Sequence, residues 1–130
     1  MKMDYKIPFL SDLYHHTQKN PSAMVLHNAP SGEVFSRQQL LRDISAFRDR
    51  LFSLLDARTT RSLHSRNEEV YIAIMLPLSY DFVVVFLSIL SIGAIAVPLR
   101  EYYFRALKDE LWSNQLLTRD YDRSYYIIGN

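Results

Sequence analysis

The least polar part of the chain runs from Val70 to Leu99 and carries a single formal charge, Asp81. Its first segment, Val70–Leu76, is rich in β-branched and aromatic residues and ends at Pro77. A run of this kind, without polar alternation, is typical of a strand buried on both faces of a parallel sheet. The pattern therefore predicts a central parallel strand over these residues.

The remainder of this apolar stretch predicts one helix and a second strand. Ser79 is a suitable N-cap residue for a helix over Phe82–Ile92, and Gly93 is a natural left-handed stop for that helix. Ala94–Val97 follows as a short strand that closes at Pro98. A strand, a helix and a strand in this order form a β-α-β unit with parallel strands and a right-handed crossover.

A second helix is predicted from Ser36 onward. Ser36 and Gln39 form a capping box, in which each side chain satisfies a free backbone N–H of the other residue. The residues after this cap repeat an apolar side chain at helical period until the pattern fades near Asp56: Leu40, Ile44, Phe47, Leu51 and Leu54. Ala57–Glu69 is polar and has no period, which predicts a loop.

Upstream of this helix the pattern predicts a short helix and a hairpin, after a mobile lead-in over residues 1–8. The short helix starts at Pro8 and ends near Asn20, and its apolar face is marked by Phe9, Leu13 and His16. Ala23–Leu26 and Val34–Phe35 are short apolar runs separated by turn-forming residues. They predict the two strands of a β-hairpin.

The last part of the chain differs in character, and we expect residues 100–130 to be a divergent tail after a domain formed by residues 1–99. A helix over about residues 104–117 is indicated by three positions on one face: Leu107, Leu111 and Gln115. Thr118–Ser124 is polar, and Tyr125–Ile128 is a candidate strand.

Composition and charge narrow the function classes. The 130 residues form one domain at most, with 48% hydrophobic and 22% charged residues, as in globular proteins. The net charge of +1 gives no global field for nucleic acid. Without cysteine, the chain has no disulfide framework, thiolate metal site or cysteine nucleophile. The N-terminal residues contain no apolar run of signal-peptide length, so we expect a cytoplasmic protein.

Candidate chemistry from side chains is sparse. Asp12, His15 and His16 are neighbours on the first predicted helix, but adjacent histidines point about 100° apart and do not readily serve one metal ion. A solvated helix face explains them better, and His27 and His64 are isolated turn and loop residues. No metal site is expected.

Two further sets of side chains suggest binding surfaces. Residues 37–66 are locally basic, because they include seven arginines: Arg37, Arg42, Arg48, Arg50, Arg58, Arg61 and Arg66. Asp43, Asp49 and Asp56 offset part of this positive charge. No groove-fitting element or stacking platform accompanies them, so nucleic-acid binding is not expected. The aromatic residues of the tail form either a partner surface or a cover for an open sheet edge, or hang loose: Tyr102, Tyr103, Phe104, Trp112, Tyr121, Tyr125 and Tyr126.

Four motifs occur in order in the central stretch: a strand ending in Leu-Pro, a Ser-x-Asp-Phe helix start, a Gly-Ala pair and a strand ending in Val-Pro-Leu. They are Leu76-Pro77, Ser79–Phe82, Gly93-Ala94 and Val97–Leu99. Together they resemble the N-terminal region of ATP-dependent, AMP-forming acyl-CoA synthetases, the adenylate-forming enzymes. Residues 39–51 and 95–99 are similar to the malonyl-CoA or fatty-acyl-CoA synthetase branch. The resemblance covers about residues 8–99. It implies an α/β fold, a partial N-terminal domain with a β-hairpin, an amphipathic helix and one β-α-β unit.

The resemblance also implies a chemistry, in which a carboxylic acid is joined to AMP from ATP with magnesium and then passed to coenzyme A. Such enzymes hold the phosphates in a Ser/Thr/Gly-rich loop that ends in lysine. The glycines of this chain, Gly32, Gly93 and Gly129, lie in no such loop, and the ribose-binding acid and the catalytic lysine have no counterpart. We therefore assign no catalytic, cofactor-binding or metal residue. We expect a truncated relative that is non-catalytic alone and holds no ATP, magnesium or CoA.

Two other functions stay open. The chain is either an interaction module that docks on a synthetase or another subunit through an unfinished sheet edge, or a small single-span membrane protein. Phe82–Leu99 is uncharged and just reaches the length of a membrane span, about 18 residues. However, Gly93 and Pro98 break it, Ser88 and Ser91 lower its hydrophobicity, and no aromatic belt flanks it. The membrane alternative is therefore the weaker one.

Overall fold

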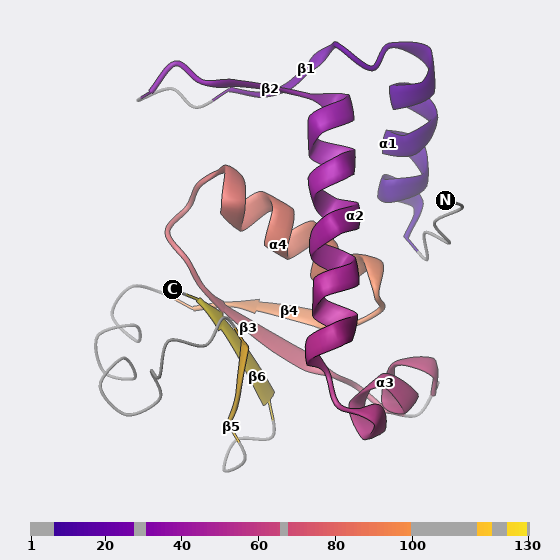
Figure 1. The fold of residues 1–130 in the computed structure, drawn as a ribbon, viewed down its shortest axis with the longest axis vertical. Coiled ribbons are helices and arrows are strands. Elements are labelled where there is room, and N and C mark those ends of the chain that lie inside the picture. The colour runs from indigo at the N-terminus through magenta and orange to yellow at the C-terminus, as the bar shows by residue number, and fades with distance from the viewer. Residues whose placement is uncertain (1–6, 28–30, 66–67, 100–116, 121–124, 130) are drawn as a thin grey trace.

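The chain folds into a layer of helices on one side of a mixed β-sheet, with a separate hairpin above them (Figure 1). The computed structural model describes residues 7–27, 31–65, 68–99, 117–120 and 125–129. The elements in chain order are α1 (Pro8–Lys19), β1 (Met24–His27), β2 (Val34–Ser36), α2 (Arg37–Leu54), α3 (Ala57–His64), β3 (Tyr71–Met75), α4 (Tyr80–Ser91), β4 (Ile95–Pro98), β5 (Leu117–Asp120) and β6 (Tyr125–Gly129).

The larger sheet has the strand order β4-β3-β6-β5, so β3 lies between two parallel neighbours. Tyr71 lies opposite Ile95 of β4, and Ile72 lies opposite Tyr126 of β6. β5 joins the far side of β6 in the antiparallel direction. The predicted central parallel strand, the β-α-β unit β3-α4-β4 and the candidate strand over Tyr125–Ile128 are thereby confirmed.

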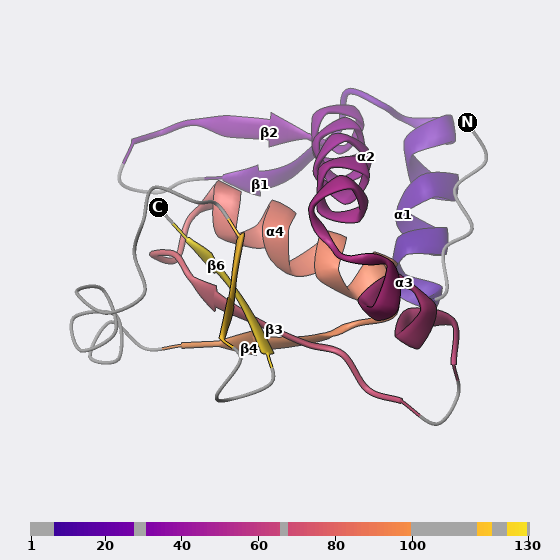
Figure 2. The same cartoon turned by 60° about the horizontal axis from the view of Figure 1, so that its bottom comes forward.

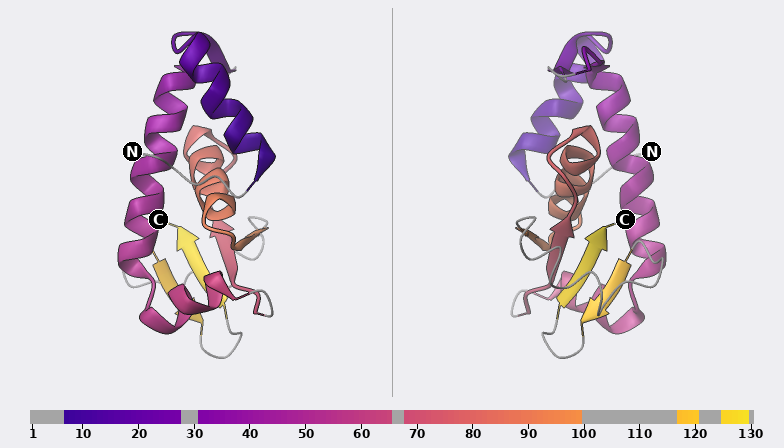
Figure 3. Two further views of the ribbon diagram at one scale, coloured as in Figure 1. Left: turned by 90° about the vertical axis from the view of Figure 1, so that its right-hand side faces the viewer. Right: turned by 90° about the vertical axis from the view of Figure 1, so that its left-hand side faces the viewer.

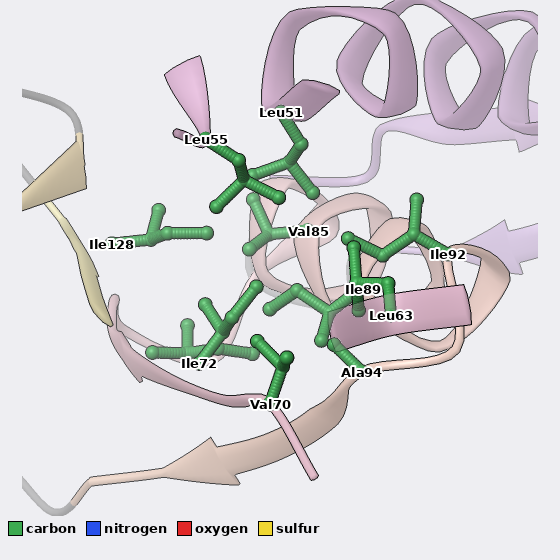
Figure 4. Packing of buried hydrophobic residues seen from close by; sticks show 11 residues of the cluster. Leu51, Leu55, Leu63, Val70, Ile72, Val85, Ile89, Ile92, Ala94 and Ile128 are labelled. Carbon is green, nitrogen blue, oxygen red and sulfur yellow. The ribbon is translucent and has the colours of Figure 1, made fainter. Parts of the chain in front are cut away.

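Helices α2, α3 and α4 pack on one face of this sheet (Figure 2). The core between the two layers is a cluster of aliphatic side chains in which Ile72 of β3, Ile89 of α4 and Ile128 of β6 are fully buried (Figure 4). Leu51 of α2 and Leu63 of α3 complete it from the other helices. Each such side chain contributes about 1.5–3 kcal/mol through burial, so this cluster is the main tie between the sheet and its helices.

Helices α1, α2 and α4 lie side by side (Figure 3), and a second apolar cluster joins them. Leu10 of α1 and Ile44 of α2 are fully buried in it. Buried Ser88 of α4 donates a hydrogen bond to the carbonyl of Val84, at 2.6 Å, and reaches the carbonyl of Ile44 at 3.3 Å. The small serine lets α2 and α4 approach closely while its hydroxyl stays satisfied.

The predicted cap and stop residues of the helices are confirmed, although α4 begins at Tyr80 and not at the predicted Phe82. Ser36 Oγ accepts a hydrogen bond from the Gln39 backbone N–H at 3.1 Å, and Ser79 Oγ accepts one from the Phe82 N–H at 3.3 Å. Gly93 follows α4 with a φ of +85°, the left-handed conformation that only glycine adopts readily. These local signals fix where the helices begin and end. The predicted hairpin is also present, as the antiparallel pair β1 and β2.

The predicted loop over Ala57–Glu69 is wrong, because Ala57–His64 forms α3. Asp56 caps this helix, since its Oδ1 accepts a hydrogen bond from the Thr59 N–H at 2.7 Å. Thr59 and Leu63 are buried and lie four residues apart, on one face of the helix. Two inward positions on a short polar helix are too few to produce a visible periodicity.

Two predicted helix faces are partly wrong. In α1 the buried side chains are Leu10, Leu13 and Thr17, whereas Phe9 is 57% exposed and His16 is exposed. In α2 the stripe is correct up to Leu51, but Leu54 is 45% exposed. The chain leaves the helix after Leu54, so the next residue, Leu55, enters the core instead.

The predicted helix over residues 104–117 lies outside the described residues except at its end, where Leu117 begins β5. Part of the predicted polar segment, Thr118–Asp120, also belongs to that strand. Within the described part of the chain, no helix is both long enough and apolar enough to cross a membrane.

Candidate functional site

The carboxyl end of the parallel strands is the first place to look for a site, because open α/β sheets bind ligands there. After β3 the chain passes through Leu76, Pro77 and Leu78 before α4 begins. Leu78 is 88% exposed at the top of this connection. The hydroxyl of Ser79 is engaged, since it donates to the carbonyl of Pro77 at 3.0 Å and caps α4. The connection therefore exposes the apolar side chain of Leu78, while the hydroxyl of Ser79 is already hydrogen-bonded to neighbouring backbone groups.

Beside this connection, side chains from three elements meet at Tyr80, the first residue of α4. The Tyr80 hydroxyl donates a hydrogen bond to Oδ2 of Asp43 in α2 at 2.5 Å. The ring of Tyr80 stacks on the ring of Phe35 in β2, with centroids 3.8 Å apart and planes within 4°. Residues 35, 43 and 80 are far apart in sequence, so no local pattern could indicate this cluster.

The chemistry available to the cluster follows from its electrostatics. Burial raises the pKa of Tyr80 above its ordinary value, and the hydrogen bond and charge of Asp43 raise it further. The phenol therefore stays protonated at neutral pH and acts as a hydrogen-bond donor to a carboxylate. A tyrosine that stays protonated is neither a general base nor a nucleophile. The cluster therefore serves to hold β2, α2 and α4 together.

The histidines lie apart from this cluster. Asp12, His15 and His16 are exposed on α1, where the rings of Tyr14 and His15 form a T-shaped pair with a centroid distance of 5.7 Å. His27 in β1 and His64 at the end of α3 are exposed as well. Among the residues that the structure describes, no group of three His, Cys, Asp or Glu side chains is close enough to hold a metal ion.

The arginines predicted to form a basic region are spread along α2 and α3, and Arg66 lies outside the described residues. Arg48 is half-buried and places its guanidinium carbon 5.4 Å from the centroid of the Phe52 ring, one helical turn away. Its buried Nε has no hydrogen-bond partner among the residues that the structure describes. Of the tail aromatics, Tyr102, Tyr103, Phe104, Trp112 and Tyr121 lie outside the described residues, and Tyr125 and Tyr126 belong to β6.

The arrangement of the sheet, its helices and the hairpin resembles part of the N-terminal fold of solved acyl-CoA synthetases. The N-terminal domain of FACL13 from Mycobacterium tuberculosis, solved with a bound inhibitor, has a TM-score of 0.56 and 18% identity over 77% of this chain. A Mycobacterium tuberculosis fatty acyl CoA synthetase has a TM-score of 0.54 and 17% identity over 77% of the chain, and VinN has 0.55 and 19% over 83%. The predicted resemblance is thereby confirmed at the level of the fold.

These likenesses cover only a part of each solved structure. The chain spans 24% of the FACL13 domain, 19% of the fatty acyl CoA synthetase and 27% of VinN. No protein-family model and no curated protein matches the sequence. The comparisons therefore define the fold of the chain and carry no residue roles to it.

Proposed function

We propose that the chain is a scaffold segment of the N-terminal domain of an ATP-dependent, AMP-forming acyl-CoA synthetase. The observation that carries this proposal is the likeness of the fold to such N-terminal domains, with TM-scores of 0.54 to 0.56. The four motifs of the central stretch support it, since they fall on the end of β3, the start of α4, the turn after α4 and the end of β4. In this role the segment holds the sheet and does not touch the reacting groups.

The chain alone is proposed to be non-catalytic and to bind none of ATP, magnesium and CoA. The side-chain contacts of the apolar β-α-β unit support this. Ser79, Ser88 and Ser91 each donate to a backbone carbonyl within or next to α4, and Tyr80 donates to Asp43. These hydroxyls donate their hydrogen bonds within the protein, where they stabilise the fold, and we propose that they do not bind a substrate.

Two measurements test the proposal. Purified chain is incubated with ATP, magnesium and short, medium or long carboxylic acids, and ATP–pyrophosphate exchange is measured against a fatty acyl-CoA synthetase as positive control. We expect exchange no faster than the protein-free blank, and formation of acyl-AMP by the chain alone would overturn the non-catalytic role.

For the family assignment, the coding DNA beyond codon 130 is read in all three frames. Absence of any Ser/Thr/Gly-rich loop ending in lysine would contradict it.

A second candidate function is association through the sheet edge. β4 is an edge strand in the described sheet, and Ile95 on it is 37% exposed. An edge strand has unpaired backbone groups on which another strand can add. Size-exclusion chromatography with light scattering checks this: a dimer that Ile95→Lys converts to a monomer supports it, and a monomer at every concentration excludes self-association.

The location of the protein in the cell is also a proposal. We propose the cytoplasm, which the cysteine-free sequence supports because such a chain needs no oxidising compartment. Fractionation of cells that express a tagged full chain tests it. Recovery in the membrane pellet, released only by detergent, would contradict this location.

A further inference from the structure

No residue of the two hairpin strands is fully buried. β1 and β2 form a sheet of their own, and this sheet leaves Met24, Val25 and Val34 exposed, at 60%, 36% and 55%. A two-stranded hairpin alone is only marginally stable in water. Its position therefore depends on its contacts with the body of the molecule. These include the side chains of Leu26 and Phe35, the Ser36 cap of α2, and the hydrogen bond that the Arg37 N–H donates to the carbonyl of Ala23.

Phe35 is the contact that ties the hairpin to the start of α4. Its ring lies flat on Tyr80, and Tyr80 is fastened in turn to α2 by the hydrogen bond to Asp43. Figures 1 and 2 both place the hairpin over the N-terminal end of α4. One tyrosine therefore contacts the hairpin with its ring face and α2 with its hydroxyl.

Tyr80 also belongs to the connection that follows β3. It comes directly after Ser79, whose side chain caps α4 and bonds back to Pro77. A shift of the Tyr80 backbone would disturb this cap, because the N–H groups of Phe82 and Val83 both bond to Ser79. The hairpin and the connection thus share one anchoring residue at the carboxyl end of the sheet, where ligands bind in α/β folds.

We infer that Phe35, Asp43 and Tyr80 form a latch. While it is closed, the latch holds the β1–β2 strands and the β3–α4 connection in place together. When it opens, both segments are released in one step while the fully buried members of the two apolar clusters stay packed. The latch would operate in this fold whether or not the chain takes part in acid activation.

Native-state hydrogen exchange of the full chain, read amide by amide by NMR, tests the latch. Tyr80→Phe keeps the ring and removes the hydroxyl. We expect it to accelerate exchange of the paired amides in β1 and β2 and of the Phe82 and Val83 amides by a common factor of about ten, the size expected for a lost hydrogen bond to a charged group. Asp43→Asn keeps a neutral acceptor and should produce a smaller common factor. Exchange in the buried turns of α4 and in β3 should not change.

The matched control is Tyr71→Phe, which removes a tyrosine hydroxyl that also bonds a carboxylate, Glu69, but at the amino end of β3. It should leave hairpin exchange unaltered. Faster exchange in the hairpin without any change at Phe82 and Val83, or the reverse, would overturn the latch, as would no change in either segment. A uniform rise over the whole chain in Tyr80→Phe but not in Asp43→Asn would show general destabilisation and also refute it.

Discussion

Ile128 tests whether the last strand is part of the folded core. This side chain is fully buried in the cluster formed with β3, α4 and α2, although it is residue 128 of 130. Ile128→Ala removes three carbons, which is about 2–2.5 kcal/mol of transfer free energy at roughly 0.8 kcal/mol per buried CH₂. The cavity left behind adds to this, so a loss of about 2–5 kcal/mol is expected.

Urea unfolding followed by circular dichroism measures this loss. A domain of this size has an m-value of about 1–3 kcal/mol/M in urea, so a loss of 3 kcal/mol lowers the midpoint by roughly 1–3 M. If the total stability is near the lower end of the usual range of about 5–15 kcal/mol, the alanine variant will be largely unfolded. Ile128→Val then replaces it, with an expected loss of about 0.5–1.5 kcal/mol.

The control is Ile95→Ala on β4, which deletes the same atoms from a side chain that is 37% exposed. Its loss should be clearly smaller, about 1–1.5 kcal/mol, because part of the side chain is already in water. Equal losses of unfolding free energy in the two variants would show that Ile128 is no more buried than Ile95. A loss below about 0.5 kcal/mol in Ile128→Ala would show that β6 does not pack on the helices in solution.

The caps and the latch give three further predictions. Asp56→Ala removes the acceptor for the Thr59 N–H and should lower the free energy of urea unfolding by about 1 kcal/mol. Gly93→Ala places a side chain at a φ of +85° and should lower the thermal midpoint through a loss of about 1–2 kcal/mol. Burial and Asp43 raise the pKa of Tyr80 above 10.0, so its contribution to stability is complete below pH 10 and should fall as the pH rises further. Urea unfolding at a series of pH values measures this fall, and the free energy of unfolding of Tyr80→Phe should depend less steeply on pH above 10.

Each of these three predictions has a comparison that can contradict it. Asp49→Ala removes an exposed carboxylate from α2 and should change the unfolding free energy by less than about 0.5 kcal/mol. Gly93→Asn should cost less than Gly93→Ala, since asparagine tolerates the left-handed region better. Equal slopes of stability against pH in wild type and Tyr80→Phe above pH 10 would show that this phenol ionises as freely in the folded chain as in the unfolded one.

The elements that sequence reasoning predicted correctly carry their own local signals. Ser79 caps α4 and Gly93 ends it, and both act through backbone groups within four residues. β3 was predictable because Ile72–Met75 are all buried, which leaves no polar alternation in the sequence. These signals were enough for the β-α-β unit and for the resemblance to acyl-CoA synthetases.

The elements that were missed depend on contacts distant in sequence. α3 has only Thr59 and Leu63 buried, and a polar segment with two inward residues reads as a loop. The place of Tyr125–Gly129 in the sheet is decided by pairing with β3, which no property of that segment encodes. The cluster at Tyr80 is of the same kind, because Asp43 lies 37 residues away along the chain.

The strand order β4-β3-β6-β5 has a consequence for synthesis of the chain. β3 pairs with β4 soon after both leave the ribosome, but its other edge must wait for β6, about 50 residues later. At about 5–20 residues per second, roughly 3–10 s pass with one backbone edge of the central strand unpaired. During that interval an unpaired apolar strand can add to strands of other nascent chains. Slower translation over residues 76–124 would lengthen the exposure, so yield of folded protein should depend on codon usage there and on chaperones that cover this edge.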